Sequence, residues 1–114
     1  MINKSEKFLI KGGKPLNGKI KISGAKNAAS KQIISSLLTD QPVKISNCPI
    51  GISEIITTRE ICETIGSKFT KFSDNEVIVQ TKTIKDFSFS AELGQVNRLS
   101  ILTIGPLFIH NKII

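Results

Sequence analysis

The first quarter of the chain alternates between polar and apolar residues in a way that predicts two short strands. Residues 19–23 place Ile20 and Ile22 between lysines and a serine, the period of two that is typical of a half-buried strand. Residues 6–11 form a similar stretch, and the glycines and proline between the two stretches predict a turn. From residue 25 to about residue 39, apolar side chains recur every three or four positions, which predicts an amphipathic helix.

The rest of the pattern predicts three further strands and two further helices. We expect strands at residues 43–46, 68–72 and 76–81, and helices at residues 53–65 and from residue 92 to about residue 105. Gly66 is placed to end the first of these helices, and Pro106 should terminate or kink the second. Asp74 and Asn75 suit a tight hairpin because both tolerate positive φ. The order β-β-α-β-α-β-β-α predicts an α/β or α+β fold with helices on one side of a sheet.

The composition is that of one globular domain. The 114 residues have a mass of 12.5 kDa, and 39% are hydrophobic and 22% charged, which excludes a disordered chain. No apolar run is long enough for a signal peptide or a spanning helix, so we expect a cytoplasmic protein. Cys48 and Cys62 fit no zinc-ligand spacing and are expected to pack as small hydrophobic residues. The apolar residues 107–109 and 113–114 reach the end of the chain without a polar cap or a closing strand, which leads us to expect a sequence cut short.

The net charge of +7 is concentrated in one part of the chain. Residues 1–31 hold eight lysines and one acidic residue, whereas the remaining residues hold eight basic and eight acidic side chains. This distribution favours attraction to an anion, although a biased composition with solvated lysines explains it equally well. Only Phe8 is aromatic in the basic segment, which weakens a nucleic-acid interpretation because single-stranded nucleic acid is bound by stacking. A small anionic metabolite is at least as good a candidate.

Lys26 is the first candidate for chemistry, because it lies where a predicted strand becomes a helix. Free N–H groups at a helix N-terminus favour an anion, and a lysine in the first turn opposes the dipole by about 0.3–1 kcal/mol unless an anion lies nearby. The alternative is a solvated surface lysine. The surrounding Ser23-Gly24-Ala25-Lys26-Asn27 run has neither the P-loop nor the dinucleotide-binding glycine pattern.

Arg98 is the second candidate, since it is one of two arginines and its predicted helix is otherwise apolar. Such an arginine either extends to water or makes a bidentate contact to phosphate or carboxylate. His110 is the single histidine and offers little support for a catalytic triad. No ligand cluster indicates a metal site, and no pair of carboxylates indicates acid–base catalysis.

The run from Gly18 to Ala29, GKIKISGAKNAA, resembles the opening of the UDP-N-acetylglucosamine enolpyruvyl transferase family. The similarity continues through residues 37–39, 42–45 and 47–49 and returns at residues 98–101 and 105–107, so it covers nearly the whole chain in order. The related enzymes that act on shikimate 3-phosphate typically read Gly-Ser-Lys-Ser where this chain has Ala25-Lys26-Asn27. The resemblance therefore favours the nucleotide-sugar enzymes.

This resemblance implies a fold of βαβαββ repeats arranged as an inside-out α/β barrel. Residues 1–22 would supply N-terminal strands of the family's second domain and the crossover. Residues 23–114 would form the first part of its first domain, about one repeat and the start of the next. The chain would then be a single incomplete unit, an N-terminal fragment.

The resemblance also implies a reaction, the transfer of the enolpyruvyl group from phosphoenolpyruvate to the 3-hydroxyl of UDP-N-acetylglucosamine. This step commits the nucleotide sugar to peptidoglycan synthesis and requires no metal or organic cofactor. Lys26 would be catalytic, since it would pair with phosphoenolpyruvate and stabilise charge in the tetrahedral intermediate. Asn27 would bind phosphoenolpyruvate and the nucleotide sugar, and Arg98 would lie along the UDP-N-acetylglucosamine site.

The chain departs from the family pattern at Ser30-Lys31, usually Leu-Pro, and at Leu102, usually tryptophan. It also ends before the glycine-rich loop that carries the family's general acid, so we expect no turnover by the chain alone. Two other interpretations remain open. One is a non-catalytic remnant that binds a nucleotide sugar or needs a complementary chain with the missing repeats. The other is an unrelated basic module that binds nucleic acid.

Overall fold

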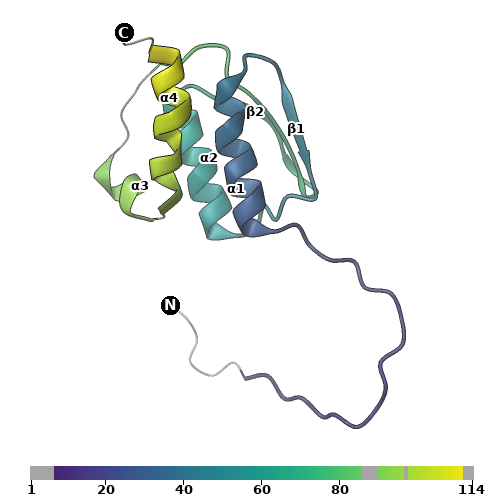
Figure 1. Cartoon of the computed structure of the whole chain (residues 1–114). Coiled ribbons are helices and arrows are strands. Elements are labelled where there is room, and N and C mark those ends of the chain that lie inside the picture. Colours follow the sequence, from purple (N-terminus) through teal and green to yellow (C-terminus); the bar gives the residue numbers. More distant parts are fainter. Residues whose placement is uncertain (1–6, 86–89, 97, 112–114) are drawn as a thin grey trace.

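A three-stranded sheet covered on one side by helices forms the body of the protein in the computed structural model, which describes residues 7–85, 90–96 and 98–111 (Figure 1). The arrangement confirms an α+β fold with helices on one side of a sheet. In chain order the elements are α1 (Lys26–Ser35), the 3-10 helix η1 (Ser36–Leu38), β1 (Val43–Ser46), α2 (Ser53–Ile65), β2 (Lys68–Ser73), β3 (Glu76–Gln80), α3 (Ala91–Val96), the 3-10 helix η2 (Arg98–Thr103) and α4 (Ile104–Asn111).

The sheet is antiparallel throughout, with the strand order β1-β3-β2. Strands β2 and β3 form the predicted hairpin. Its two central residues, Asp74 and Asn75, have φ values of 53° and 55°, the left-handed conformation that matches the twist of a two-residue hairpin turn. Strand β1 pairs with β3 on the other side, where Val43 lies opposite Val79.

A bulge in β2 turns two phenylalanines toward the helices. Phe69 pairs with Val79 and Phe72 with Val77, so Thr70 is the extra residue in the register. Strict alternation would place Phe69 and Phe72 on opposite faces of the sheet. The bulge instead lets both rings face α2, where the Arg59 guanidinium lies 5.6 Å and 4.7 Å from their centroids.

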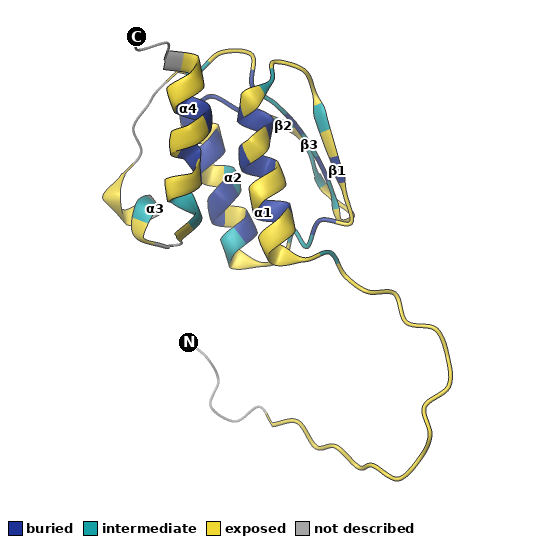
Figure 2. Cartoon of the chain, in the orientation of Figure 1, coloured by how far each residue is buried: buried dark blue, intermediate teal, exposed yellow. Residues whose placement is uncertain are grey.

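The core lies between the inner face of the sheet and helices α1 and α2 (Figure 2). Val77 and Val79 of β3 are fully buried against it, as the alternation of that strand predicts. The helices contribute apolar side chains that lie along their inner faces. These are Ile33 of α1, Leu37 of η1, and Ile55, Ile61 and Ile65 of α2. The predicted helices 25–39 and 53–65 are therefore confirmed, the first as α1 continued by η1.

The predicted last helix is divided into three pieces, and the expectation for Pro106 is wrong. Pro106 lies in the first turn of α4 instead of ending a helix. A proline is tolerated there because the N–H that it lacks would have no partner within the helix. Residue 97, which falls between α3 and η2, lies outside the described residues.

The strands predicted at residues 6–11 and 19–23 are not formed in the described residues. Residues 7–25 run as an extended segment away from the sheet (Figure 1), and Ile20 and Ile22 are 88% and 76% exposed. An alternating pattern needs a neighbouring strand to supply hydrogen bonds, and no strand of this sheet pairs with the segment. Residues 1–6 lie outside the described residues. The assignment of residues 1–22 to a second domain, and the barrel itself, stay predictions.

Candidate functional site

The predicted Ser23–Asn27 junction leads the chain into α1 through a close backbone contact. A Cβ atom on Gly24 would lie 1.7 Å from the carbonyl oxygen of Asn47, so only glycine fits. Asn47 itself has a φ of 55°, and its Nδ2 donates a hydrogen bond to the Ile22 carbonyl at 3.4 Å. The junction is thus held against the turn that follows β1. The helix then begins after Ala25, which caps it without a side-chain hydrogen bond.

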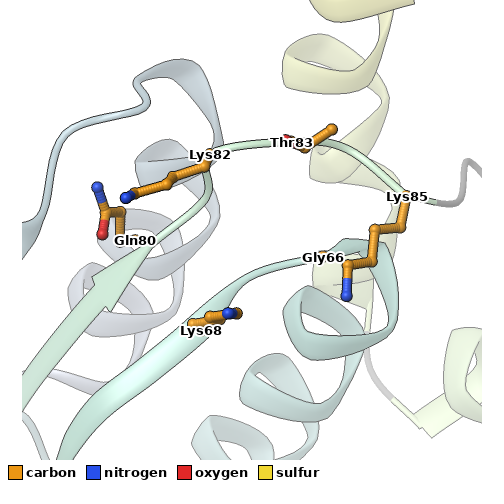
Figure 3. Close-up of a pocket in the computed structure, with 6 residues that line it drawn as sticks. All are labelled: Gly66, Lys68, Gln80, Lys82, Thr83 and Lys85. Carbon is orange, nitrogen blue, oxygen red and sulfur yellow. The ribbon is translucent and has the colours of Figure 1, made fainter.

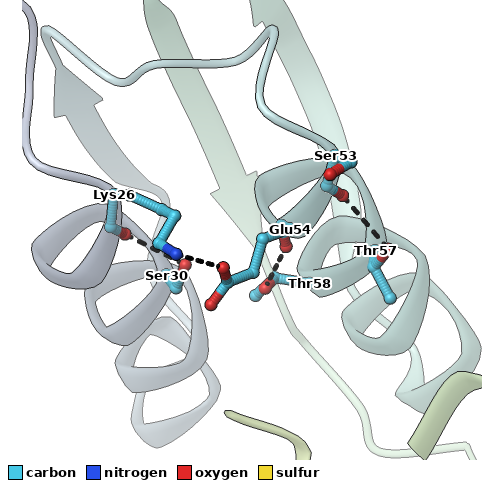
Figure 4. A network of polar contacts seen from close by, with 6 residues as sticks. All are labelled: Lys26, Ser30, Ser53, Glu54, Thr57 and Thr58. Atoms are coloured by element: carbon cyan, nitrogen blue, oxygen red, sulfur yellow. Dashed lines mark hydrogen bonds and ion pairs between the residues drawn. The ribbon is translucent and has the colours of Figure 1, made fainter. Parts of the chain in front are cut away.

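Lys26 is the first residue of α1, and its ammonium group forms an ion pair with a residue from another helix. The Lys26 Nζ lies 2.6 Å from Oε2 of Glu54, the second residue of α2 (Figure 4). The first turn of α1 contains no acidic residue of its own. A nearby negative group offsets the unfavourable interaction between a lysine and a helix N-terminus, and Glu54 supplies it.

The Lys26–Glu54 pair joins two helix N-termini. Helices α1 and α2 run in the same direction, and α4 begins at that end of the helical layer too (Figure 1). At the opposite end, the His110 Nε2 of α4 donates to the Leu37 carbonyl of η1, which fixes the parallel arrangement. Three helix N-termini therefore direct partial positive charge toward the end of the molecule where Lys26 lies.

Asn27 and Arg98 are placed near this end but are not joined to the pair. Asn27 is the exposed second residue of α1. Arg98 is the exposed first residue of η2, and η2 packs against α1 and α2. Within the described part of the chain, no hydrogen bond or ion pair connects Arg98 with Lys26 or Asn27. The structure thus brings together Lys26 and Glu54, and it leaves Asn27 and Arg98 open to solvent.

A small hollow of about 180 Å³ lies beside the junction. Small side chains on the first turns of α1 leave this space, and the turn after β1 closes it. Its lining consists of Gly24, Ala25, Ala28, Ala29, Gln32, Ile45, Ser46, Asn47 and Cys48. Neither Lys26 nor Asn27 lines the hollow, so any ligand of these two residues would lie outside it, above the end of α1.

A larger pocket, of about 450 Å³, lies at the other end of α2 (Figure 3). We call it the three-lysine pocket, because Lys68, Lys82 and Lys85 line it together with Gly66, Gln80 and Thr83. None of these described lining residues carries a carboxylate. The pocket lies against the C-terminus of α2, whose partial negative charge accounts for nearby lysines without a ligand.

The remaining sequence candidates are structural. Cys48 and Cys62 are buried free thiols, and burial raises the pKa of both, that of Cys62 to about 12. They pack as small hydrophobic residues, as predicted. In the described ranges, no group of histidine, cysteine and acidic side chains is arranged to hold a metal ion. Of the helices built by these residues, none combines the length and apolar character needed to cross a bilayer.

Glu54 is the site residue that the sequence analysis missed. A signal was present, because an acidic residue at the second position of the predicted helix 53–65 is stabilised by the helix dipole. The pattern could not reveal that this carboxylate faces Lys26, because that depends on how α1 and α2 pack together.

A comparison with known protein families identifies the family of this chain. A model of the EPSP synthase family, 3-phosphoshikimate 1-carboxyvinyltransferase, matches residues 10–110. The described unit and its lysine-bearing junction fall within that match. The chain belongs to the EPSP synthase family, a family of enolpyruvyl, or carboxyvinyl, transferases.

Individual relatives carry the name that the sequence resemblance predicted. The chain is 43% identical over 102 residues to the UDP-N-acetylglucosamine 1-carboxyvinyltransferase of Halorhodospira halophila, covering 90% of this chain and 24% of the relative. The enzymes of that name from Idiomarina loihiensis and Photobacterium profundum are 37% and 38% identical, with the same coverage. The chain thus spans about a quarter of the length of these relatives.

Proposed function

We propose that this chain forms the lysine-bearing part of a UDP-N-acetylglucosamine enolpyruvyl transferase, with phosphoenolpyruvate and UDP-N-acetylglucosamine as substrates. In this reaction the sugar 3-hydroxyl gives up its proton and its oxygen bonds to C2 of phosphoenolpyruvate, while a proton adds to C3. The tetrahedral intermediate then loses phosphate and a C3 proton, which restores the double bond. The observation that carries the proposal is Lys26 at the start of α1, within the residues 10–110 that match the family model.

The position of Lys26 suits binding of the anionic substrate. Its ammonium has three N–H donors, of which the contact with Glu54 occupies one. Two donors remain for the carboxylate or phosphate of phosphoenolpyruvate. The dipoles of α1 and α2 add to the attraction because both N-termini meet there. As charge develops in the tetrahedral intermediate, a fixed ammonium stabilises it without reorganisation.

Asn27 and Arg98 extend the proposed site toward the nucleotide sugar. Asn27 follows Lys26 on α1, so its exposed amide can orient phosphoenolpyruvate and the sugar together. Arg98, exposed on η2, offers a planar guanidinium that suits bidentate contact with a phosphate of UDP-N-acetylglucosamine. Both residues would be ordered by the ligand.

The proposal for residues 1–114 alone is binding without turnover. The chain covers about a quarter of the length of the relatives it matches, and the family resemblance implies that the general acid lies in a loop outside residues 1–114. Catalysis would need further segments, in the same chain or in a complementary one. The cytoplasmic location and the role in peptidoglycan synthesis belong to this proposal.

The test is a binding titration with matched variants. We expect UDP-N-acetylglucosamine and phosphoenolpyruvate to bind saturably, and Lys26→Ala or Arg98→Ala to weaken binding. Lys31→Ala removes an equal charge from an exposed position of α1 and is the control. Equal losses with Lys26→Ala and Lys31→Ala would show that general charge, and not the site, attracts the ligands.

Two further measurements separate the alternatives. Release of phosphate from phosphoenolpyruvate by the chain alone would contradict the absence of turnover. Affinity for single-stranded nucleic acid with a steep salt dependence, together with no binding of the nucleotide sugar, would instead favour the basic module. A relative can supply the repeats that residues 1–114 do not contain. If the chain binds the nucleotide sugar but shows no enolpyruvyl transfer even after these repeats are added, the non-catalytic remnant would be favoured.

A further inference from the structure

Glu54 is the closest charged neighbour of the proposed substrate-binding lysine. The Nζ–Oε2 distance of 2.6 Å is the shortest of the four ion pairs found among the described residues. The Glu54 side chain is 23% exposed and that of Lys26 is 44% exposed, so the carboxylate is the more enclosed partner. The pair bridges two helices, unlike the Arg59–Glu63 pair, whose members lie one turn apart on α2.

The backbone around both members is held in place by side-chain hydroxyls (Figure 4). On α2, Thr58 Oγ1 donates to the Glu54 carbonyl at 2.7 Å, and Thr57 Oγ1 donates to the Ser53 carbonyl at 3.1 Å. On α1, Ser30 Oγ donates to the Lys26 carbonyl at 3.0 Å. Each first helical turn is therefore tied to the turn that follows it, which holds the backbone from which the Lys26 and Glu54 side chains extend.

We propose that Glu54 is the positioning residue for Lys26, the resident counter-ion that holds the ammonium at the junction of α1 and α2 and limits its affinity for anions. The proposal rests on the proposed function, in which Lys26 binds phosphoenolpyruvate. Before the ligand arrives, Glu54 restricts the long lysine side chain to one orientation. When the ligand arrives, it shares the ammonium with Glu54 and is repelled by the carboxylate.

This arrangement has a chemical consequence for the reaction. The phosphate released from phosphoenolpyruvate is itself an anion that Lys26 attracts. A carboxylate beside Lys26 lowers the positive potential that the departing phosphate experiences, so the product leaves more readily. Glu54 would thus keep the Lys26 side chain oriented and, at the same time, weaken its binding of the phosphate product.

Replacement of Glu54 by glutamine tests the proposal in the full chain. Glu54→Gln keeps the size and removes the charge. At low salt, we expect it to tighten binding of phosphoenolpyruvate and of inorganic phosphate by about three- to tenfold, as expected for removal of one charge near the ligand. Glu54→Asp keeps the charge and should stay within about twofold of the native affinity. Glu60→Gln removes the same charge from an exposed position of α2 and should also stay within about twofold.

A double variant isolates the action through Lys26. In a Lys26→Ala background, Glu54→Gln should no longer tighten binding, because the ammonium that it releases is absent. If the tightening persists in that background, or if Glu54→Gln and Glu60→Gln behave alike, the proposal is overturned and the carboxylate has only a general effect on charge. Circular dichroism spectra should show the same helix content for all variants.

A measurement without ligand keeps this proposal separate from the proposed function. If the native chain binds no phosphoenolpyruvate, the proposed function fails, and the pair is then tested by 15N NMR of the lysine ammonium groups. We expect a slowly exchanging Lys26 signal in the native chain and in Glu54→Asp, lost in Glu54→Gln and kept in Glu60→Gln. An unchanged Lys26 signal in Glu54→Gln would overturn the role of Glu54 whatever the chain binds.

Discussion

Both ends of helix α2 have lysine beside a glycine: Lys26 near Gly24 at the N-terminal end, and three lysines near Gly66 at the C-terminal end. The positive charge is compensated differently at the two ends. At the N-terminal end, Lys26 lies where helix dipoles are positive, and the carboxylate of Glu54 compensates it. At the C-terminal end, the lysines of the three-lysine pocket lie where the α2 dipole is negative, and no carboxylate is among the described residues that line that pocket. At the N-terminal end, the lysine is repelled by the helix dipoles and a carboxylate side chain compensates this repulsion. At the C-terminal end, the helix dipole itself attracts the lysines.

This difference separates a candidate site from a basic surface. The larger pocket is at the C-terminal end, yet its lysines are explained by the helix terminus alone. The smaller hollow is at the N-terminal end, where a negative partner offsets the unfavourable interaction between a lysine and the helix dipoles. An incoming anion can take the place of that partner. The repulsion between Lys26 and the helix dipoles, and not the volume of the cavity, therefore indicates which end of α2 carries the candidate site.

Removal of a lysine from each end should give the largest contrast. Lys26→Ala should weaken binding of phosphoenolpyruvate by about 10- to 100-fold, because a charge-assisted hydrogen bond contributes about 1.5–3 kcal/mol. Lys82→Ala, in the three-lysine pocket, should change the affinity by less than about twofold. Isothermal titration calorimetry at fixed salt measures both. A larger loss with Lys82→Ala would move the candidate site to the other end.

The glycine at each end should be needed for stability. Gly24→Ala would bring a Cβ 1.7 Å from the Asn47 oxygen, and Gly66→Ala would bring one 2.5 Å from the Thr83 oxygen at a φ of 132°. We expect each substitution to lower the free energy of unfolding by about 1–3 kcal/mol in urea denaturation. Gly51→Ala, with open space around the Cβ, is the control. Only Gly24→Ala should also weaken ligand binding, and the same loss with Gly66→Ala would contradict this assignment.

The two cysteines report on the two ends through their thiol chemistry. Cys48 lines the hollow beside Gly24, and Cys62 lies in the last turn of α2. Burial raises the pKa of Cys62 from 9.0 to about 12, so its thiol stays protonated in the fold and ionises first in the unfolded chain. Its burial therefore stabilises the fold below pH 9, and this contribution declines as the pH rises from 9 toward 12.

Alkylation with iodoacetamide at pH 8 measures this difference. We expect both thiols to react slowly in the folded chain, Cys62 more slowly than Cys48, and both to react quickly in urea. Mass spectrometry of the labelled peptides separates the two sites. Fast labelling of Cys62 without denaturant would show that the C-terminal end of α2 opens more easily than the packing implies.

The smallest effect on stability is expected for a charge cluster on the sheet, which lies away from both ends of α2. There the carboxylate of Glu76 pairs with two lysines, Lys44 and Lys71. Hydrogen bonds from Lys44 and Lys71 hold the pKa of Glu76 below its ordinary value of 4.5. Because the pKa is lowered by folding, this stabilisation is present above about pH 4.5 and is lost as the pH falls through the folded value.

Thermal unfolding between pH 3 and pH 7 tests this contribution. We expect Glu76→Gln to lower the melting temperature slightly at pH 7 and by less at pH 3, because the stabilisation declines as the pH falls toward the lowered pKa of the native carboxyl group. Glu60→Gln, at an exposed position, is the control and should show no such pH dependence. An equal change at both pH values would mean that the side chain acts by packing instead of by charge.

Much of the fold could be predicted because its signals are local. The apolar spacing of residues 53–65 and the tolerance of Asp74 and Asn75 for positive φ each act within a few residues. These elements form as expected. The predicted strands at residues 6–11 and 19–23 do not, because a strand depends on a neighbour, and alternation alone does not provide one. The bulge at Thr70 could not be predicted either, since only pairing with β3 reveals it.

The sequence by itself determined that a lysine stands at the start of a helix, since the glycine, the apolar spacing and the position of Lys26 all lie within one short run. It thereby determined an unfavourable interaction between the lysine and the helix dipole, which a negative partner offsets. Only the tertiary structure decided that Glu54 is this partner, because the distance between two side chains on different helices is set by how α1 and α2 pack on the sheet. Local periodicity fixes the face that a helix buries, and packing fixes which charges meet at its end.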